Sequence, residues 1–225
     1  MIPAPADWSR VVKLDPARSL SRERLEAVRA WRPDAVVVGG TGGYGAGEVL
    51  ALLMRLRHLD LPLAMEISDQ AALCPGFDLY LVPMVLNSRQ TEWIIGRHHA
   101  AVKRFAQRAE WERLVVEGYC ILNPAASAAE LTQADTGLLV DDVAAYARVA
   151  EHLLHLPIFY LEYSGAYGPP EMVQAVRRVL GETRLWYGGG ITSDRQATEM
   201  GAWADTIVVG NAVYDEERGD VLLSP

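Results

Sequence analysis

The sequence predicts an α/β protein with the modified (β/α)8 architecture of a TIM barrel. Short β-branched runs alternate with amphipathic stretches almost from end to end, as is typical of a parallel sheet covered by helices. Eight such runs occur in 225 residues, and barrels of this kind usually need roughly 200 to 250 residues. A doubly wound open sheet is the structural alternative. No linker, low-complexity tract or charge block divides the chain, so we expect residues 1–225 to form a single domain.

The predicted strands are apolar runs that each lead into a polar or glycine-rich turn. They cover Arg10–Leu14, Ala35–Val38, Leu61–Ile67, Leu79–Val82, Tyr119–Leu122, Ile158–Leu161, Arg184–Tyr187 and Thr206–Val209. The predicted helices cover Ser21–Trp31, Gly47–His58, Glu92–Glu112, Asp142–Leu154, Pro170–Leu180 and Ser193–Met200. Ser21 is expected to cap the first helix, and Glu23 lies in its first turn, where a negative charge interacts favourably with the helix dipole.

The connection between the third and fourth strands is too short for a helix. Only Ser68–Phe77 separates the two strands, and this segment contains Cys74-Pro75-Gly76. Proline and glycine together favour a turn. We therefore expect a loop in place of the third helix and a gap in the helical ring.

Composition and charge exclude several classes of protein. The formal net charge is −8, whereas nucleic-acid-binding surfaces are normally basic. The densest apolar stretch, Leu79–Leu86, is interrupted by Pro83 and falls short of the roughly 20 residues of a membrane span. No secretory signal is evident in the first residues. We expect a cytoplasmic protein in which Cys74 and Cys120 are reduced and packed.

The glycine-rich turns after the last two strands point to a phosphate site. Gly188–Gly190 precedes the predicted Ser193 helix, and Gly210-Asn211 follows an apolar strand. Glycine allows backbone N–H groups to point at an anion, and a helix N-terminus adds a favourable dipole. These two turns form the usual phosphate site of the fold. Tight turns without a ligand are the simpler alternative.

Four further positions carry the candidate chemistry. Asp15 and Thr41 end adjacent strands, and a carboxylate with a hydroxyl could form part of a Mg²⁺ shell; a turn cap before Pro16 is the alternative for Asp15. Glu162 follows an apolar strand and is a candidate general base, with a hydrogen bond to backbone as the structural alternative. Lysine is rare, since 19 of the 21 basic residues are Arg, which draws attention to Lys13 and Lys103; of the two, Lys13 lies near the end of a predicted strand.

Other candidates are weaker. Asp141-Asp142 resembles a diphosphate-binding pair but lacks a third acid nearby, and it is better interpreted as a helix N-cap. The five His residues form no ligand set with the spacing of a zinc site. Trp93–Ile95, at the start of a long predicted helix, is a core segment by default, but it follows soon after the missing helix, so it could instead form the wall of an apolar groove.

Several motifs in consistent order resemble those of a known family, the geranylgeranylglyceryl phosphate and heptaprenylglyceryl phosphate synthases. The most specific are Tyr160–Gly168, Trp186–Ile191 and Ala204–Asn211, and Lys13–Pro16, Val38–Thr41 and Val85–Ser88 match as well. The likeness extends from about residue 8 to about residue 215. Members of this family have a barrel that lacks the third helix, in agreement with the short third connection.

The resemblance implies transfer of a long prenyl group from its diphosphate to the C3 hydroxyl of sn-glycerol 1-phosphate, with Mg²⁺ as cofactor. Glu162 would take the proton from the attacking hydroxyl, and Asp15 and Thr41 would ligate Mg²⁺. The residues implied to contact glycerol phosphate are Lys13, Tyr160, Leu161, Glu162, Tyr163, Ser164 and Gly165, with Gly190, Gly210 and Asn211 holding its phosphate.

The length of the prenyl chain depends on the segment Gly96–Ala101, where a bulky side chain could close the groove. Ala100 and Ala101 are small, which favours a C35 heptaprenyl chain over C20 geranylgeranyl. The resemblance also implies a homodimer, and so apolar a substrate is compatible with transient contact with a membrane surface. Two other functions stay open: another phosphate-binding barrel enzyme such as a sugar-phosphate isomerase, and a non-catalytic phosphate- or prenyl-binding barrel.

Overall fold

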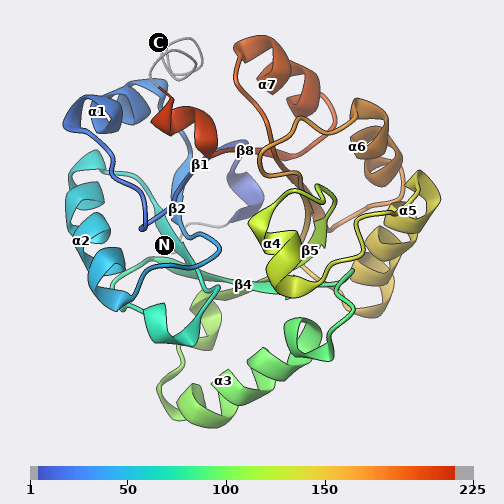
Figure 1. The fold of residues 1–225 in the computed structure, drawn as a ribbon, viewed down its shortest axis with the longest axis horizontal. Coiled ribbons are helices and arrows are strands. Elements are labelled where there is room, and N and C mark those ends of the chain that lie inside the picture. Colours follow the sequence, from blue (N-terminus) through green and yellow to red (C-terminus); the bar gives the residue numbers. More distant parts are fainter. Residues whose placement is uncertain (1–4, 216–225) are drawn as a thin grey trace.

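A computed structural model describes residues 5–215 and confirms the closed barrel (Figure 1). The eight strands follow one another around the barrel in chain order, every pairing is parallel, and β8 pairs with β1. They are β1 (Arg10–Leu14), β2 (Ala35–Val38), β3 (Leu63–Glu66), β4 (Leu79–Val85), β5 (Leu114–Ile121), β6 (Ile158–Glu162), β7 (Arg184–Gly188) and β8 (Thr206–Val209). The open-sheet alternative is therefore wrong.

Helices form a ring outside the strands. They are α1 (Arg22–Trp31), α2 (Ala46–Leu56), α3 (Arg97–Phe105), α4 (Ser127–Thr132), α5 (Val140–Arg148), α6 (Pro170–Arg177) and α7 (Asp194–Gly201). Ser21 caps α1 as predicted, because its hydroxyl accepts a hydrogen bond from the Arg24 backbone N–H at 3.2 Å. Ser193 caps α7 in the same way through the N–H of Gln196.

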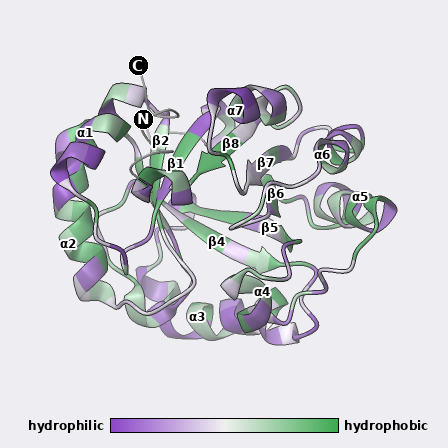
Figure 2. Cartoon of the chain, turned by 45° about the horizontal axis from the view of Figure 1, so that its top comes forward, coloured by the Kyte–Doolittle hydropathy of each residue, from purple (hydrophilic) through white to green (hydrophobic). Residues whose placement is uncertain are grey.

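The hydrophobic core has two layers, because successive side chains of a strand point to opposite faces. The inner cluster fills the barrel and includes Val37, Leu81, Tyr160 and Trp186. The outer cluster lies between the strands and the helices. Figure 2 shows hydrophobic residues along the strands and mixed colours on the surrounding helices. The barrel interior is thus packed, and space for a ligand is left to the ends of the strands.

The third connection has no α-helix. Between β3 and β4 the chain forms a single 3-10 turn, Gln70–Ala72, so the expected loop in place of the third helix is confirmed. Figure 1 shows α3, the next helix in the chain, at the periphery of the ring beside this loop and β4.

The predicted helix Glu92–Glu112 is wrong in its continuity. The segment begins with a π-helical turn (Glu92–Gly96), continues as α3, and then forms two 3-10 turns, Ala106–Arg108 and Trp111–Arg113. Ala109, between these turns, has extended backbone angles. No residue of the π-turn or of α3 is fully buried. Because tertiary packing supplies most of the stability of a protein helix, little favours further regular turns here.

Three smaller predictions are corrected. Strand β5 starts at Leu114, five residues before the predicted Tyr119, and the short helix α4 was not predicted. Neither Asp141 nor Asp142 is the N-cap of its helix: Leu139 is the N-cap, and Asp142 contributes to capping from the first turn, where it accepts the Leu139 backbone N–H at 2.9 Å.

Cys74 and Cys120 are free and buried, as predicted. Within residues 5–215, no helix is both long enough and apolar enough to cross a bilayer.

Candidate active site

A cavity of about 1280 Å³ opens at the carboxyl ends of the strands. One end is polar and lies over the barrel, and the other is an apolar groove between β4 and the segment 93–113. Most of the predicted site residues line this cavity. They are Lys13, Asp15, Thr41, Tyr160, Glu162, Ser164, Gly165, Gly190, Gly210 and Asn211.

Two predicted substrate contacts, Leu161 and Tyr163, do not line the cavity. Their side chains belong to the outer cluster, between the strands and the helices. The alternation of β6 explains this, since Tyr160 and Glu162 point inward and the residues between them point outward. Tyr163 instead packs beside Tyr187, with ring centroids 6.1 Å apart, and its side chain leaves no room for a Cβ at Gly168. Tyr163 thus packs against the backbone of the loop after β6 at Gly168.

Lys13 is the centre of a polar cluster at the floor of the cavity. Its Nζ lies 2.8 Å from both carboxylate oxygens of Glu66 and 3.2 Å from the Tyr119 hydroxyl. The Tyr119 hydroxyl also donates a hydrogen bond to Glu66. Burial would lower the pKa of Lys13, but Glu66 above all, with Glu162 and Glu117, outweighs burial and raises that pKa above its ordinary value. Lys13 is therefore a fixed positive charge that borders the cavity.

Glu66 and Tyr119 were not predicted as site residues. Glu66 was visible as a carboxylate at the end of a predicted strand, and only its contact with Lys13 in the closed barrel reveals its role. Tyr119 came at the start of a predicted strand, where nothing distinguished it from a core residue. Both line the cavity.

Glu162 ends β6 and is 4% exposed. One carboxylate oxygen accepts the backbone N–H of Ser164 at 2.6 Å, which fixes the orientation of the carboxyl group. Burial raises the pKa of Glu162, while the charge of Lys13 opposes this shift. A buried, oriented carboxylate with a raised pKa has the properties of a general base, and the predicted role is geometrically feasible.

The loops after β6, β7 and β8 form a cradle of backbone groups around the polar end. Gly165, Gly189 and Gly190 have φ values of +88°, +150° and +57°, a region that residues with a Cβ rarely adopt. A Cβ on Gly190 would collide with the backbone of Ala166 and Tyr167. The cradle lies at the start of α7, and backbone N–H groups at a helix N-terminus attract anions.

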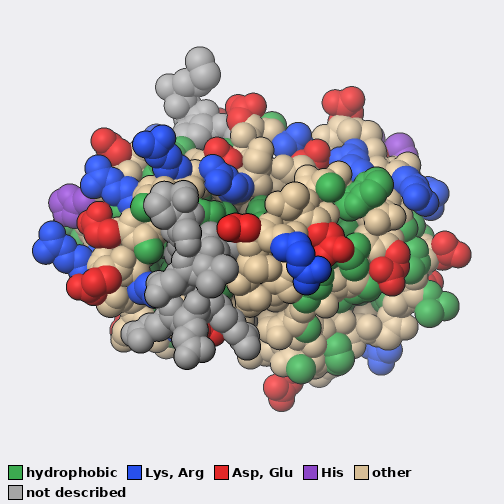
Figure 3. All heavy atoms as spheres, turned by 90° about the horizontal axis from the view of Figure 1, so that it is seen from above, with side chains coloured by type: hydrophobic (Ala, Val, Ile, Leu, Met, Phe, Trp, Pro, Cys, Tyr) green, Lys and Arg blue, Asp and Glu red, His purple; other side chains and the backbone are tan. Residues whose placement is uncertain are grey.

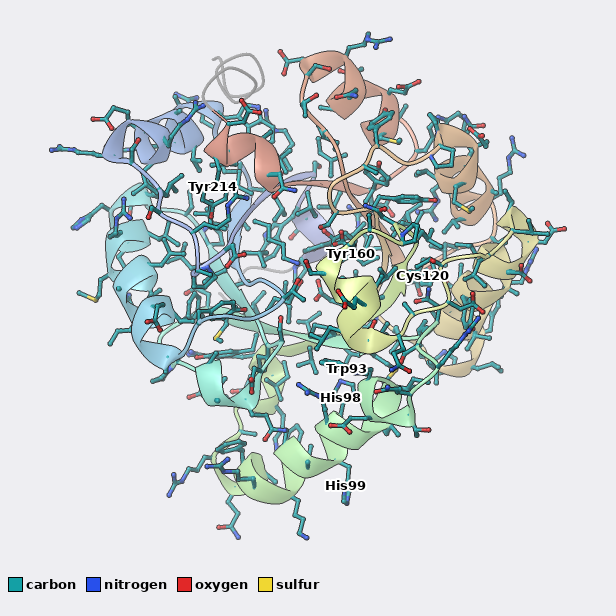
Figure 4. The ribbon with its side chains drawn as sticks, viewed as in Figure 1. Trp93, His98, His99, Cys120, Tyr160 and Tyr214 are labelled. Carbon is teal, nitrogen blue, oxygen red and sulfur yellow. The ribbon has the colours of Figure 1, made fainter. Side chains whose placement is uncertain are left out.

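Arg18, which was not predicted, supports the far side of the cradle. Its guanidinium donates a hydrogen bond to Asn211 Oδ1 at 2.9 Å and stacks 3.7 Å from the centroid of Tyr214. Figure 4 shows Tyr214 near the strands that begin and end the barrel. Arg18 therefore fixes the Asn211 amide and adds a positive charge to the cavity wall.

Asp15 and Thr41 are the candidate metal ligands. The carboxylate of Asp15 lies so close to Gly40 that a Cβ there would come within 2.8 Å of both its oxygens, and Thr41 is the next residue. Asp15 Oδ1 also accepts the N–H of Ala17 at 2.8 Å, so part of the turn-cap alternative holds. Residues 5–215 contain no group of three or more His, Cys, Asp and Glu side chains that could bind a metal.

As predicted for the segment Trp93–Ile95, the side chains of Trp93 and Ile95 form part of the wall of the apolar groove. Tyr80, Val82 and Met84 of β4 form one side, and Ala101, Val102 and Phe105 of α3 form the other. Ala101 borders the groove, whereas Ala100 is exposed and lies in a separate shallow depression. In Figure 4, Trp93 and His98 lie between α3 and the barrel and His99 points away from it. His98 Nε2 lies 2.9 Å from the Pro83 carbonyl oxygen.

The model of the PcrB family matches residues 5–223 of this sequence. The chain belongs to the PcrB family. Among its relatives in that family, the heptaprenylglyceryl phosphate synthase of Geobacillus kaustophilus is 58% identical over 208 residues, which cover 92% of this chain and 87% of that one. The heptaprenylglyceryl phosphate synthase of Bacillus cereus is 51% identical over 93% of this chain and 91% of its own.

Solved structures agree with the fold of this PcrB family member. The (S)-3-O-geranylgeranylglyceryl phosphate synthase of Thermoplasma acidophilum, solved with sn-glycerol-1-phosphate, superposes with a TM-score of 0.81 at 20% identity, covering 94% of this chain and 88% of that one. The corresponding enzyme of Thermoplasma volcanium gives 0.82 at 18% identity, with 95% and 88% covered. At sequence identities of 18 to 20%, this structural similarity establishes the shared barrel fold and no more.

Proposed function

We propose that this protein transfers a long prenyl group from its diphosphate to the C3 hydroxyl of sn-glycerol 1-phosphate. The observation that carries the proposal is the composition of one cavity, which joins a cradle of glycines and basic side chains to a long apolar groove. A small phosphorylated acceptor fits the first and a prenyl chain fits the second. The substrate of a sugar-phosphate isomerase is small and polar and would not occupy an apolar groove.

The names of the relatives support this function. Enzymes that are more than half identical to this chain are heptaprenylglyceryl phosphate synthases, and the Thermoplasma acidophilum enzyme of the same fold binds sn-glycerol-1-phosphate. At the polar end, the cradle that includes Gly190, Gly210 and Asn211 would hold the phosphate, and Lys13 would add a positive charge.

The cofactor we propose is Mg²⁺, held by Asp15 and Thr41. A carboxylate and a hydroxyl are hard oxygen donors of the type that Mg²⁺ prefers, and this ion usually retains several waters and takes phosphate oxygens as further ligands. Two protein ligands are therefore sufficient. When bound, Mg²⁺ supplies neutralisation of the charge on the departing diphosphate.

Glu162 would act as the base. The acceptor hydroxyl oxygen forms a bond to the first carbon of the prenyl chain, the bond from that carbon to the diphosphate oxygen breaks, and the hydroxyl proton passes to Glu162. The Ser164 N–H holds the carboxylate in place, and the positive charge of Lys13 opposes the rise in its pKa that burial causes. A desolvated carboxylate with a raised pKa is a stronger base than an exposed one and is well suited to accept a proton.

We propose C35 heptaprenyl as the preferred chain, because Ala101 leaves the groove open beside α3. The experiment incubates the protein with sn-glycerol 1-phosphate, prenyl diphosphates from C15 to C35, and either Mg²⁺ or EDTA, and analyses butanol-extracted products by mass spectrometry. We expect a prenylglyceryl phosphate that requires Mg²⁺ and is formed fastest from the C35 substrate. If no chain length gives a product, a non-catalytic binding protein becomes the better interpretation.

The homodimer and the cytoplasmic location remain predictions. Sedimentation velocity of the purified protein would measure the first, and fractionation of cells that express the chain would measure the second.

A further inference from the structure

The apolar groove has a solvent-exposed edge, which we call the groove rim (residues 92–113, with Leu131 of α4 beside it). Four large apolar side chains line the groove yet remain 45 to 53% exposed: Ile95, Val102, Trp111 and Leu131. A soluble monomer rarely leaves a contiguous apolar edge at a cavity mouth without a partner for it. Other exposed apolar side chains of the described residues, such as Leu50 and Met54 of α2, do not line this cavity.

The groove rim is also basic in an acidic protein. Residues 92–113 contain five Lys and Arg against three Glu, while the whole chain has a net charge of −8. Glu92 is paired with Arg97 at 3.5 Å and Glu110 with Arg113 at 2.7 Å. Lys103, Arg104 and Arg108 are exposed, and no carboxylate among residues 5–215 lies within ion-pair distance of them.

The opposite side of the molecule has a different pattern. Figure 3 views the molecule from the top of Figure 1, the side away from α3, and there acidic and basic side chains are interspersed. On the rim, by contrast, basic side chains outnumber acidic ones and flank apolar side chains that line the groove.

We propose that the groove rim docks on the surface of a membrane that contains anionic lipids. Basic residues beside Trp and aliphatic side chains are the composition of segments that lie in the interface of such membranes. Juxtaposed Lys and Arg are attracted to the negative surface potential. A second copy of this chain fits less well, because a symmetric contact would bring two basic rims together.

Docking of the groove rim on a membrane does not depend on which reaction the protein catalyses. The further step, in which a prenyl chain moves from the lipid phase into the groove, rests on the proposed function. The apolar rim residues line the groove, so a docked protein would open its prenyl site toward the membrane instead of toward water.

The experiment sediments the full-length, substrate-free protein with vesicles of phosphatidylcholine alone or of phosphatidylcholine and phosphatidylglycerol in equal amounts. We expect binding to the anionic vesicles that weakens as salt is added. The double variant Lys103→Glu/Arg104→Glu should lower the partition coefficient by about 10-fold or more, since each basic residue near such a surface contributes about fivefold. These two side chains do not line the cavity. The matched control is Arg148→Glu/Arg178→Glu, two exposed arginines beside α5 and α6.

The proposal is overturned if the wild-type protein does not sediment with anionic vesicles. It is also overturned if the control variant Arg148→Glu/Arg178→Glu loses as much vesicle binding as the rim variant Lys103→Glu/Arg104→Glu. It is also overturned if the rim pair changes only self-association in sedimentation velocity, which would assign the rim to a second copy. Prenyl transfer in detergent should be unchanged in the rim variant. A protein that docks but makes no product in detergent would retain the docking surface and lose the proposed function.

Discussion

The two ends of the cavity are built in opposite ways. At the polar end, Lys13, Glu66 and Glu162 stand on strands of the closed barrel and are held by hydrogen bonds of 2.6 to 2.8 Å. At the apolar end, α3 and the π-turn before it contain no fully buried residue. The difference indicates that the polar groups of the proposed active site are fixed in advance, while the wall of the apolar groove can adjust. Segments with few buried contacts open at low free-energy cost.

The largest expected effect comes from removing the proposed general base, Glu162, at the polar end of the cavity. Glu162→Gln keeps the shape of the side chain and its hydrogen-bonding capacity but cannot accept the proton. Turnover should fall by roughly 10² to 10⁴-fold, while binding of glycerol phosphate, measured by calorimetry, changes little. A variant with a near-normal rate would show that another group is the base.

The same residue predicts the acid side of the pH profile. Because burial raises the pKa of Glu162, the ionised base should be lost as the pH falls through a value above that of an ordinary glutamate. The rate in the wild-type protein should decrease accordingly, and the residual activity of Glu162→Gln should lack this decrease.

The next effect tests the backbone cradle. Gly190→Ala places a Cβ against the backbone of Ala166 and Tyr167 at a φ of +57°. Left-handed backbone alone costs about 1–2 kcal/mol, so both the unfolding free energy and the affinity for glycerol phosphate should drop. Gly47→Ala in α2 is the control, because its Cβ would meet nothing within 4 Å. That variant should be stabilised by roughly 0.5–1 kcal/mol. Equal effects from the two substitutions would show that the cradle does not need Gly190.

The adjustable end is tested by a pair of adjacent alanines. Ala101 lines the groove and Ala100 does not. Ala101→Trp should therefore shift the preferred substrate to shorter prenyl diphosphates in the mass-spectrometric assay, while Ala100→Trp leaves the preference unchanged. A shift in both variants, or in neither, would mean that α3 rearranges and does not set the depth of the groove.

The smallest effect concerns a buried acid beneath the fixed end. Glu117 is fully buried, and its two carboxylate oxygens have no hydrogen-bond partner among the described residues. Burial, and then Glu66, raise the pKa of Glu117 well above its ordinary value. Such a carboxyl binds its proton more tightly in the folded state. Its contribution to stability is complete below the unfolded pKa and is lost as the pH rises through the folded one.

Glu117→Gln should therefore stabilise the protein near neutral pH, by on the order of 1 kcal/mol, and have little effect at mildly acidic pH. Denaturant unfolding at the two pH values would measure this. Equal changes at both would indicate that packing, and not ionisation, dominates at this position.

The candidate site was predictable to the extent that it follows from strand ends. Lys13, Asp15, Thr41 and Glu162 each come at or just after an apolar run, and parallel strands bring their carboxyl ends to one edge. Partners supplied by other strands and loops were not predictable in this way. Glu66 lies 53 residues from Lys13 and Arg18 lies 193 residues from Asn211, and no local pattern joins residues at such separations.

The sequence by itself determined the order of the elements, the loop in place of a third helix, and the glycines of the cradle, because these depend on local backbone preference and on a period of two or 3.6 residues. Only the tertiary structure decided that Tyr160 faces the cavity while Leu161 and Tyr163 face the helices, that the segment 92–113 is broken, and that Ala101 rather than Ala100 borders the groove. Each of these outcomes depends on which neighbour buries a side chain, and that neighbour is supplied by a distant part of the chain.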